Sequence, residues 1–173
     1  AKSLISIEQW GVQQWRSMEF AFAFAQNMNI ASDAGVPDLS QVTSMRGMFT
    51  YAYTFNSPIN DWDVSNVTEM GGMFQLAVSF DQPLNGWDVS NVTDMVYMFA
   101  QTSSFDRPLG SWSLNSEIDT MGMFENSGMS VANYDATLTG WVTSNDVRSG
   151  VSFGARDLRY CNAANARTAL IEE

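Results

Sequence analysis

Hydrophobic side chains recur along this chain with a period of 25 residues. Residues 60–74 read NDWDVSNVTEMGGMF, and residues 85–99 repeat them almost unchanged as NGWDVSNVTDMVYMF. One tryptophan and two phenylalanines keep this step: Trp62, Trp87 and Trp112; Phe55, Phe80 and Phe105; Phe49, Phe74, Phe99 and Phe124. Earlier copies are degenerate, since Pro37 replaces the tryptophan of the preceding unit. Stacked copies bury each apolar side chain against its own equivalent, which explains why the chain repeats.

Two apolar spacings alternate within each unit. The I-x-x-W-x-V segment at 59–64 ends in a period of two, which predicts a short strand with its tryptophan and valine facing inward. The M-x-x-M-F segment at 70–74 has the i, i+3, i+4 spacing of a helical turn, with Thr68 as its cap. The sequence therefore predicts an α/β solenoid with one short parallel strand and one short helical turn in every repeat of about 25 residues.

The ends of the chain carry different patterns, which predict a cap on each exposed end of the repeat array. Residues 4–28 indicate a short strand followed by a helix-like coil. Towards the carboxyl end, Tyr134, Leu138 and Trp141 predict a helix that is closed at Gly140 and Trp141. Val151 and Phe153 suggest a final strand. Asn162 can cap a last helix with Ala163, Ala166 and Leu170 on one face. The expected organisation is one domain over 1–173, with an amino-terminal cap and degenerate repeat at 1–36, repeats at 37–128 and a carboxy-terminal cap at 129–173.

The full unit FNSPINDWDVSNVTEMGGMF resembles the BspA-like leucine-rich repeat, in the DUF285 variety found on bacterial surface proteins. The resemblance also includes IEQWG near the amino end and both YDATLTGW and YCNAANARTALI near the carboxyl end. It implies a right-handed, leucine-rich-repeat-like coil on a secreted or surface-anchored protein. It implies no defined activity, although adhesion is proposed for some members. The third copy departs from the motif at Ser113 and Ser116, and its apolar pattern slips to Met121 and Met123.

Composition narrows the classes of function. The formal net charge is −11 with 8 Lys and Arg residues, which argues against a basic patch for nucleic acid or an anionic membrane. No apolar run has the length of a membrane span. The chain has no histidine, so the commonest general base is absent, and Cys161 is the only cysteine, so it has no internal disulfide partner. We therefore expect a non-catalytic protein without a cofactor.

The candidate ligand-binding surface is the polar side of the predicted strands. If the tryptophans and valines face inward, these residues face outward: Asp38, Asp61, Asp63, Ser65, Asp88, Ser90 and Ser113. Copies about 4.8 Å apart align Asp38, Asp63 and Asp88 in a column whose neighbours repel by roughly 1 kcal/mol. Three interpretations stay open at this point. The column is a solvated ladder in which each carboxylate bonds its own turn, a surface for a cationic partner, or a calcium site formed by Asp61, Asp63 and Asp88.

Other residue patterns have both a structural and a functional interpretation. The M-x-x-M pairs are compatible with soft copper ligation, but helical spacing beside phenylalanine favours core packing. The repeated tryptophans are either sugar-stacking platforms or, as their inward phase favours, buried. The threonines that recur at the same place in each repeat, Thr43, Thr68 and Thr93, form either an ice-binding row or a set of helix caps. Three tyrosines are candidates for exposed aromatic side chains: Tyr51, Tyr53 and Tyr97.

The expected function is recognition or adhesion outside the cell. An elongated repeat face would bind a protein, a peptide or a surface glycan, with no nucleic-acid partner and no membrane insertion. The module would be a monomeric part of a larger surface protein. The alternative is a structural spacer that holds other domains of such a protein away from the cell.

Overall fold

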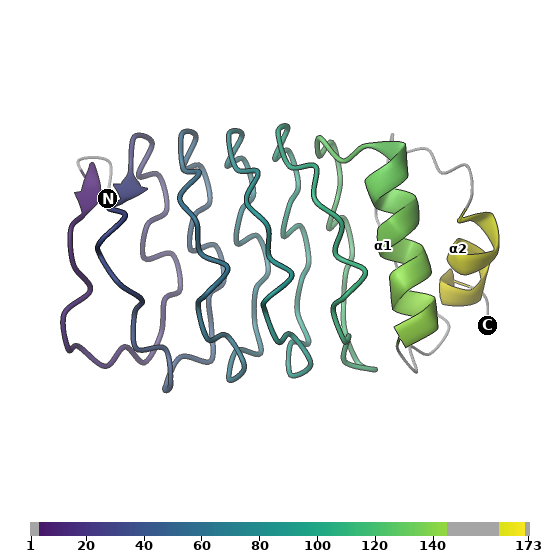
Figure 1. The fold of residues 1–173 in the computed structure, drawn as a ribbon, viewed down its shortest axis with the longest axis horizontal. Helices are drawn as coiled ribbons and strands as arrows, with labels where there is room; N and C mark the ends of the chain where they lie inside the picture. Colours follow the sequence, from purple (N-terminus) through teal and green to yellow (C-terminus); the bar gives the residue numbers. More distant parts are fainter. Residues whose placement is uncertain (1–3, 145–162, 172–173) are drawn as a thin grey trace.

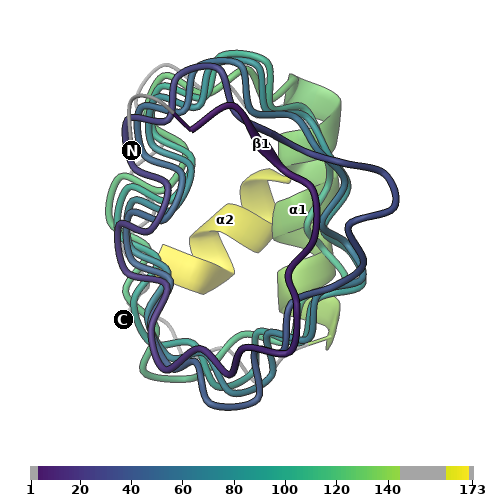
Figure 2. The same ribbon diagram turned by 90° about the vertical axis from the view of Figure 1, so that its left-hand side faces the viewer.

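The chain passes around the molecule repeatedly and builds a stack of layers. The structure, a computed structural model, describes residues 4–144 and 163–171. Successive passages lie side by side along the long axis from the amino-terminal end towards two helices (Figure 1), and they share one closed outline when viewed along the stack (Figure 2). We call each passage a layer and name it by a phenylalanine of its core: Phe22, Phe49, Phe74, Phe99 or Phe124.

Regular secondary structure lies at the two ends of this stack in the described residues. Strands β1 (Ser6–Ile7) and β2 (Asn29–Ile30) pair in parallel, with Ser6 beside Asn29 and Ile7 beside Ile30. Helices α1 (Val131–Ser144) and α2 (Ala164–Ile171) follow the last repeat (Figure 1). Neither of these described helices has the length and apolar character required to cross a membrane.

The predicted α/β solenoid, with a strand and a helical turn in every repeat, is wrong. The described residues hold two strands of two residues each and two helices, and neither kind of element recurs with the repeat. In the predicted strand at 59–64, the N–H of Trp62 donates to the carbonyl of Ile59 at 3.2 Å, within its own layer. The N–H of Val67 likewise donates to Val64 at 2.9 Å. Turns therefore use the backbone groups that a parallel strand would offer to its neighbour.

A row of consecutive turns takes the place of the predicted helical turn. We call these segments the turn rows: 17–25, 44–52, 69–77, 94–102 and 119–127. The N–H of Gly72 donates to Val96 of the next layer at 2.8 Å, whereas the N–H of Met73 donates to Met70 of its own layer at 3.1 Å. Gly72 and Leu76 have φ angles of 62° and 61°. Left-handed residues at this spacing stop a right-handed helix from continuing.

Side chains complete the hydrogen bonding between layers away from the turn rows. The side-chain amide of Asn91 donates to the carbonyl of Ser65 in the preceding layer at 2.8 Å. Thr68 does not cap a helical turn as the sequence predicts, because its hydroxyl donates to the carbonyl of Thr43 at 3.1 Å. These bonds join adjacent layers and so keep the layers in register.

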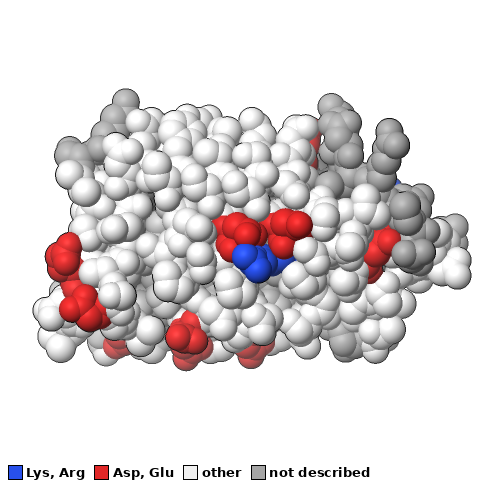
Figure 3. Space-filling view, turned by 45° about the horizontal axis from the view of Figure 1, so that its top comes forward, with Lys and Arg blue, Asp and Glu red and all other residues white. Residues whose placement is uncertain are grey.

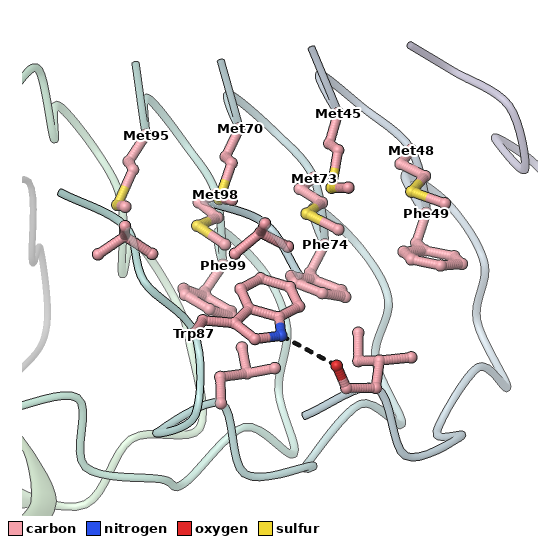
Figure 4. Close-up of a cluster of buried hydrophobic side chains, with 14 of the residues drawn as sticks. Met45, Met48, Phe49, Met70, Met73, Phe74, Trp87, Met95, Met98 and Phe99 are labelled. Atoms are coloured by element: carbon pink, nitrogen blue, oxygen red, sulfur yellow. Dashed lines mark hydrogen bonds between the residues drawn. The ribbon is translucent and has the colours of Figure 1, made fainter. Parts of the chain in front are cut away.

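Columns of aromatic and methionine side chains form the core. Phe49, Phe74 and Phe99 stack with ring centroids 5.6 and 5.5 Å apart and interplanar angles of 9°. The methionines of successive layers lie beside these rings, and the indole N–H of Trp87 donates to the carbonyl of Ile59 at 2.9 Å (Figure 4). The predicted burial of the repeated tryptophans is confirmed, with Trp62, Trp87 and Trp112 exposed by 4%, 4% and 0%.

The methionine pattern of the last repeat differs from the prediction. Met121 does not occupy a core position, because it is 46% exposed. Thr120 fills the buried position that Met95 holds in the preceding layer. The apparent slip of the apolar pattern is therefore a threonine substituted into a methionine column, and the backbone register of the layer is kept.

The ends of the stack match the expected elements in part. The predicted helix that places Tyr134, Leu138 and Trp141 on one face is confirmed, since all three are buried, although α1 continues past Gly140 to Ser144. The last helix, α2, buries Leu170 as expected, whereas Ala166 is half-buried, and Ala163 is buried just before the helix begins. At the amino end the short strand is present as β1, but a turn row replaces the helix-like coil. Four residues of the prediction lie outside the described residues: Val151, Phe153, Cys161 and Asn162.

Trp87→Ala tests the buried columns. It removes a buried indole and one of the two donors to the Ile59 carbonyl, which keeps the N–H of Trp62, so the free energy of unfolding should fall by about 3–5 kcal/mol. Trp87→Phe keeps most of the apolar area but loses the hydrogen bond, so its cost should be smaller, about 1–3 kcal/mol. Urea unfolding measures both values. A loss below about 0.5 kcal/mol for the alanine variant, as surface substitutions give, would contradict the burial.

Candidate functional site

The predicted aspartate column lies on the surface, and each carboxylate is bonded within its own turn. Asp63 Oδ1 accepts the N–H of Ser65 at 3.1 Å and the Ser65 hydroxyl at 2.6 Å. Asp88 accepts the same two donors of Ser90 at 3.1 and 2.7 Å, and Asp38 accepts the N–H of the serine two residues later. The serine hydroxyl first, and then the backbone N–H, hold the pKa of Asp63 and of Asp88 below the ordinary value.

The other predicted site residues do not join this column into one binding centre. Ser113 is exposed, but a serine stands where the preceding repeats have Asp63 and Asp88. Asp61 is exposed at the edge of a separate hollow that includes Trp62. Over residues 4–144 and 163–171, no three His, Cys, Asp or Glu side chains are arranged to hold a metal ion.

A different hollow lies on the turn-row side of the stack and crosses several layers. Its volume is about 140 Å³. Its lining consists of aromatic side chains, glycines and polar side chains: Phe20, Arg46, Gly47, Thr50, Gly71, Gly72, Gln75, Val96 and Tyr97. Enclosed ligand pockets are usually roughly 300–1,000 Å³, so this one is a shallow surface site rather than a cofactor pocket. We call it the aromatic hollow.

The stacking of equivalent positions creates the aromatic hollow. Phe20, Gly47, Gly72, Tyr97 and Gly122 occupy the same place in successive turn rows, and all have positive φ, between 51° and 66°. The ring of Phe20 lies over Gly47, and the ring of Tyr97 lies over Gly122, where a Cβ atom would clash with them. The place of a side chain at Gly72 is open, so the column has a gap in that layer.

An ion pair that spans two layers forms part of the rim. Arg46 Nη1 lies 2.9 Å from Asp94 Oδ2, with the side chains 51% and 22% exposed. The carboxylate of Asp94 lies over Gly71, where a Cβ atom would come within 2.7 Å of Oδ2. Gly71 stands between Arg46 and Val96 in the column, so its missing side chain lets the arginine reach across. The charges compensate each other at the edge of the aromatic hollow.

The remaining polar groups of the aromatic hollow are uncharged. The Thr50 hydroxyl donates to the Gln75 carbonyl at 3.3 Å, which leaves its oxygen able to accept. The Gln75 side-chain amide is half-buried and lies beside Gly72, 3.6 Å from the place of a Cβ atom. The backbone of the floor is already paired, since Gly47 donates to Gly71 at 2.9 Å. A ligand at this site would therefore contact side chains rather than backbone N–H groups.

A second set of exposed aromatic side chains borders the aromatic hollow. Phe24 lies four residues after Phe20 and stacks on Tyr51 at 4.7 Å with an interplanar angle of 12°. Tyr97 is exposed, as the sequence analysis expected of a candidate aromatic, whereas Tyr51 and Tyr53 are half-buried. Figure 3 shows another face of the molecule, on which most of the surface is uncharged and acidic side chains gather beside basic ones near the centre.

Sequence reasoning missed the aromatic hollow because it examined the wrong column. The signal was present in the repeat alignment, where the position held by Phe20 and Tyr97 is glycine in the other three copies, at Gly47, Gly72 and Gly122. An aromatic residue at a position that other copies keep as glycine marks either a packing contact or a site. Here each ring covers a glycine and still keeps 52% or 37% of its surface exposed.

The residues matched by a protein-family model are nearly the same as those that form the layers. A model described as "Mycoplasma protein of unknown function, DUF285" matches residues 16–141, from the first turn row into α1. The chain belongs to the DUF285 family. A search of curated proteins found no match to this DUF285 chain. A search of solved structures likewise found none.

The serine–aspartate turns make a testable prediction about acid. A carboxyl group with a lowered pKa in the folded state stabilises the fold above its unfolded pKa, and this contribution is lost as the pH falls through the folded pKa. In Ser65→Ala the hydroxyl donor is absent, so the pKa of Asp63 should rise towards its ordinary value. Two-dimensional NMR titration measures it, with Asp88 in the same molecule as the control. An unchanged Asp63 pKa would contradict the hydrogen bond.

Proposed function

We propose that this DUF285 protein is a non-catalytic recognition module that binds its ligand at the aromatic hollow. We further propose that it is part of a secreted or surface-anchored bacterial protein of the BspA-like group. One observation carries the first proposal: two partly exposed aromatic side chains, Phe20 and Tyr97, line a shallow hollow that is open at Gly72 and has polar side chains at its rim. Exposed aromatic surface beside a few placed polar groups is typical of binding sites.

The backbone conformation supports binding rather than a pure spacer role. Phe20 and Tyr97 have φ angles of 51° and 55°, where bulky side chains are disfavoured by roughly 1 kcal/mol. Glycine occupies the same place in three other layers at no such cost. A spacer needs only the buried columns, so it gains nothing from aromatic rings held in a strained conformation on its surface.

The chemistry of the lining supports recognition without catalysis. The carboxylate at the rim, Asp94, is occupied by Arg46 and by the N–H of Val96, to which its oxygens lie at 2.9 Å. Besides the Tyr97 hydroxyl, the remaining polar side chains of the lining are Thr50 and Gln75, which form hydrogen bonds but make a poor general acid or base pair. Such groups orient a ligand.

The proposed function predicts that binding depends on the two rings. The isolated protein should be screened against a displayed peptide library and a glycan array, beside a Phe20→Gly, Tyr97→Gly variant. Both substitutions restore the glycine found in neighbouring layers, so we expect the variant to fold with little change in stability. The wild type should bind probes of at least one class, and the variant should lose them.

A matched control keeps this screen interpretable. Val12→Ala changes a fully exposed side chain outside the lining of the aromatic hollow, so it should retain all binding. If the folded wild type binds no probe of either class, the recognition proposal is wrong and the spacer is favoured. Binding that survives the loss of both rings would place the site elsewhere.

A further inference from the structure

We infer that the ligand of the aromatic hollow is a neutral glycan. This inference rests on the proposed function and adds the chemical class of the ligand. Three properties of the site carry it: exposed aromatic rings, a rim that both donates and accepts hydrogen bonds, and compensated charge. The compensated charge and the paired backbone of the floor also argue against other classes of ligand.

The aromatic rings fit the apolar face of a sugar. A pyranose ring presents several C–H groups on one face, and such a face packs on an aromatic ring while the hydroxyl groups stay at the edge. Phe20 and Tyr97 belong to one column, three layers apart, with the ring of Phe20 over Gly47 and the ring of Tyr97 over Gly122. At about 4.8 Å per layer their backbone positions are separated by roughly 14 Å, so the site suits an extended chain of sugars.

The rim offers donors and acceptors in the mixture that hydroxyl groups require. Arg46 has N–H groups beyond the one that meets Asp94, and the Gln75 amide both donates and accepts. The Thr50 oxygen retains acceptor capacity, since its proton is directed to the Gln75 carbonyl. A polyol can use all of these groups at once, because every hydroxyl both donates and accepts.

Charge argues against ionic ligands. The cation of the lining, Arg46, is already paired with Asp94, so an acidic sugar would have to break that pair. The whole chain carries a formal net charge of −11, which repels polyanions. Cationic peptides are attracted by the same net charge, but the floor and walls of the hollow offer them no free carboxylate.

The paired backbone argues against a peptide that adds a strand. Such a peptide needs an open edge of N–H and C=O groups. In the floor, Gly47 donates to Gly71 and Gly72 donates to Val96, so these groups are already used between layers. A peptide would therefore have to bind through side-chain contacts alone. A glycan can bind through side-chain contacts alone, because it does not pair with the backbone as a strand does.

The test is titration of the folded protein with neutral hexasaccharides of glucose, mannose, galactose and N-acetylglucosamine, chosen by prior glycan-array binding. Oligogalacturonate serves as the anionic comparison. Nitrogen-15 NMR follows the amide signals of Gly47, Gly71 and Gly72, and calorimetry gives the affinity. A neutral glycan should shift these signals, and its affinity should change little with salt because no net charge is neutralised.

Two variants locate the binding energy. Tyr97→Gly removes one ring and should weaken the glycan by about tenfold. Gly72→Asn fills the gap with a residue that tolerates positive φ, and it should weaken binding by at least as much. Val12→Ala should bind as the wild type does.

The outcomes separate this inference from the proposed function. If displayed peptides bind the hollow and neutral glycans do not, the glycan inference is overturned while the recognition module stands. Preferred binding of oligogalacturonate, or glycan binding unaffected by both Tyr97→Gly and Gly72→Asn, overturns it as well. If no peptide and no glycan binds, both proposals are wrong.

Discussion

Backbone hydrogen bonds between adjacent layers, each made to the residue just before the equivalent position, set the geometry of the whole molecule. In the turn rows, alternate N–H groups donate to the next layer, as Phe49 does to Met73 and Phe74 does to Met98, at 2.8 and 2.9 Å. The intervening groups close turns within their own layer. Each layer therefore repeats the position of its predecessor, and every side chain has its equivalent as a neighbour along the axis. The phenylalanine columns and the indole bonds are consequences of this register (Figure 4).

The same register explains how a surface site arises in a regular array. Because a column contains one position from each layer, a change of residue type in a single layer leaves a gap or a projection on the surface. Gly71 lets Arg46 reach Asp94 across a layer, and two consecutive glycines separate Phe20 from Tyr97. The buried columns tolerate fewer such changes, although Thr120 shows that one methionine position accepts a small polar residue. The residue type therefore varies most from layer to layer at surface positions.

Burial could be predicted from the sequence better than secondary structure could. The 25-residue step correctly assigned Trp87, Phe74 and Met70 to the core, and the spacing of Tyr134, Leu138 and Trp141 identified α1. The elements within a repeat were wrong because burial spacing does not determine hydrogen bonding. A row of turns can bury residues at i, i+3 and i+4 as a helix does, and Trp62 and Val64 can both be buried without a strand.

The candidate site was less predictable for a related reason. The aspartates were correctly placed on the surface, but their hydroxyl donors, two residues away, occupy them locally. The aromatic hollow depends on positive φ angles at Phe20 and Tyr97, which no hydrophobic pattern indicates. Its polar rim depends on Arg46 meeting a residue 48 positions later. Such contacts depend on which residues of adjacent layers lie side by side. The predicted strands and helical turns would have placed other residues next to one another.

NMR scalar couplings across hydrogen bonds test this register most directly. They connect the amide nitrogen of a donor to the carbonyl carbon of its acceptor, so they identify bonded pairs without a structural assumption. The layered structure predicts coupling from Phe74 to Met98 and from Gly72 to Val96, each 24 residues further along the chain. Coupling from Phe74 to Met70 within the same repeat, as a helical turn requires, would contradict it.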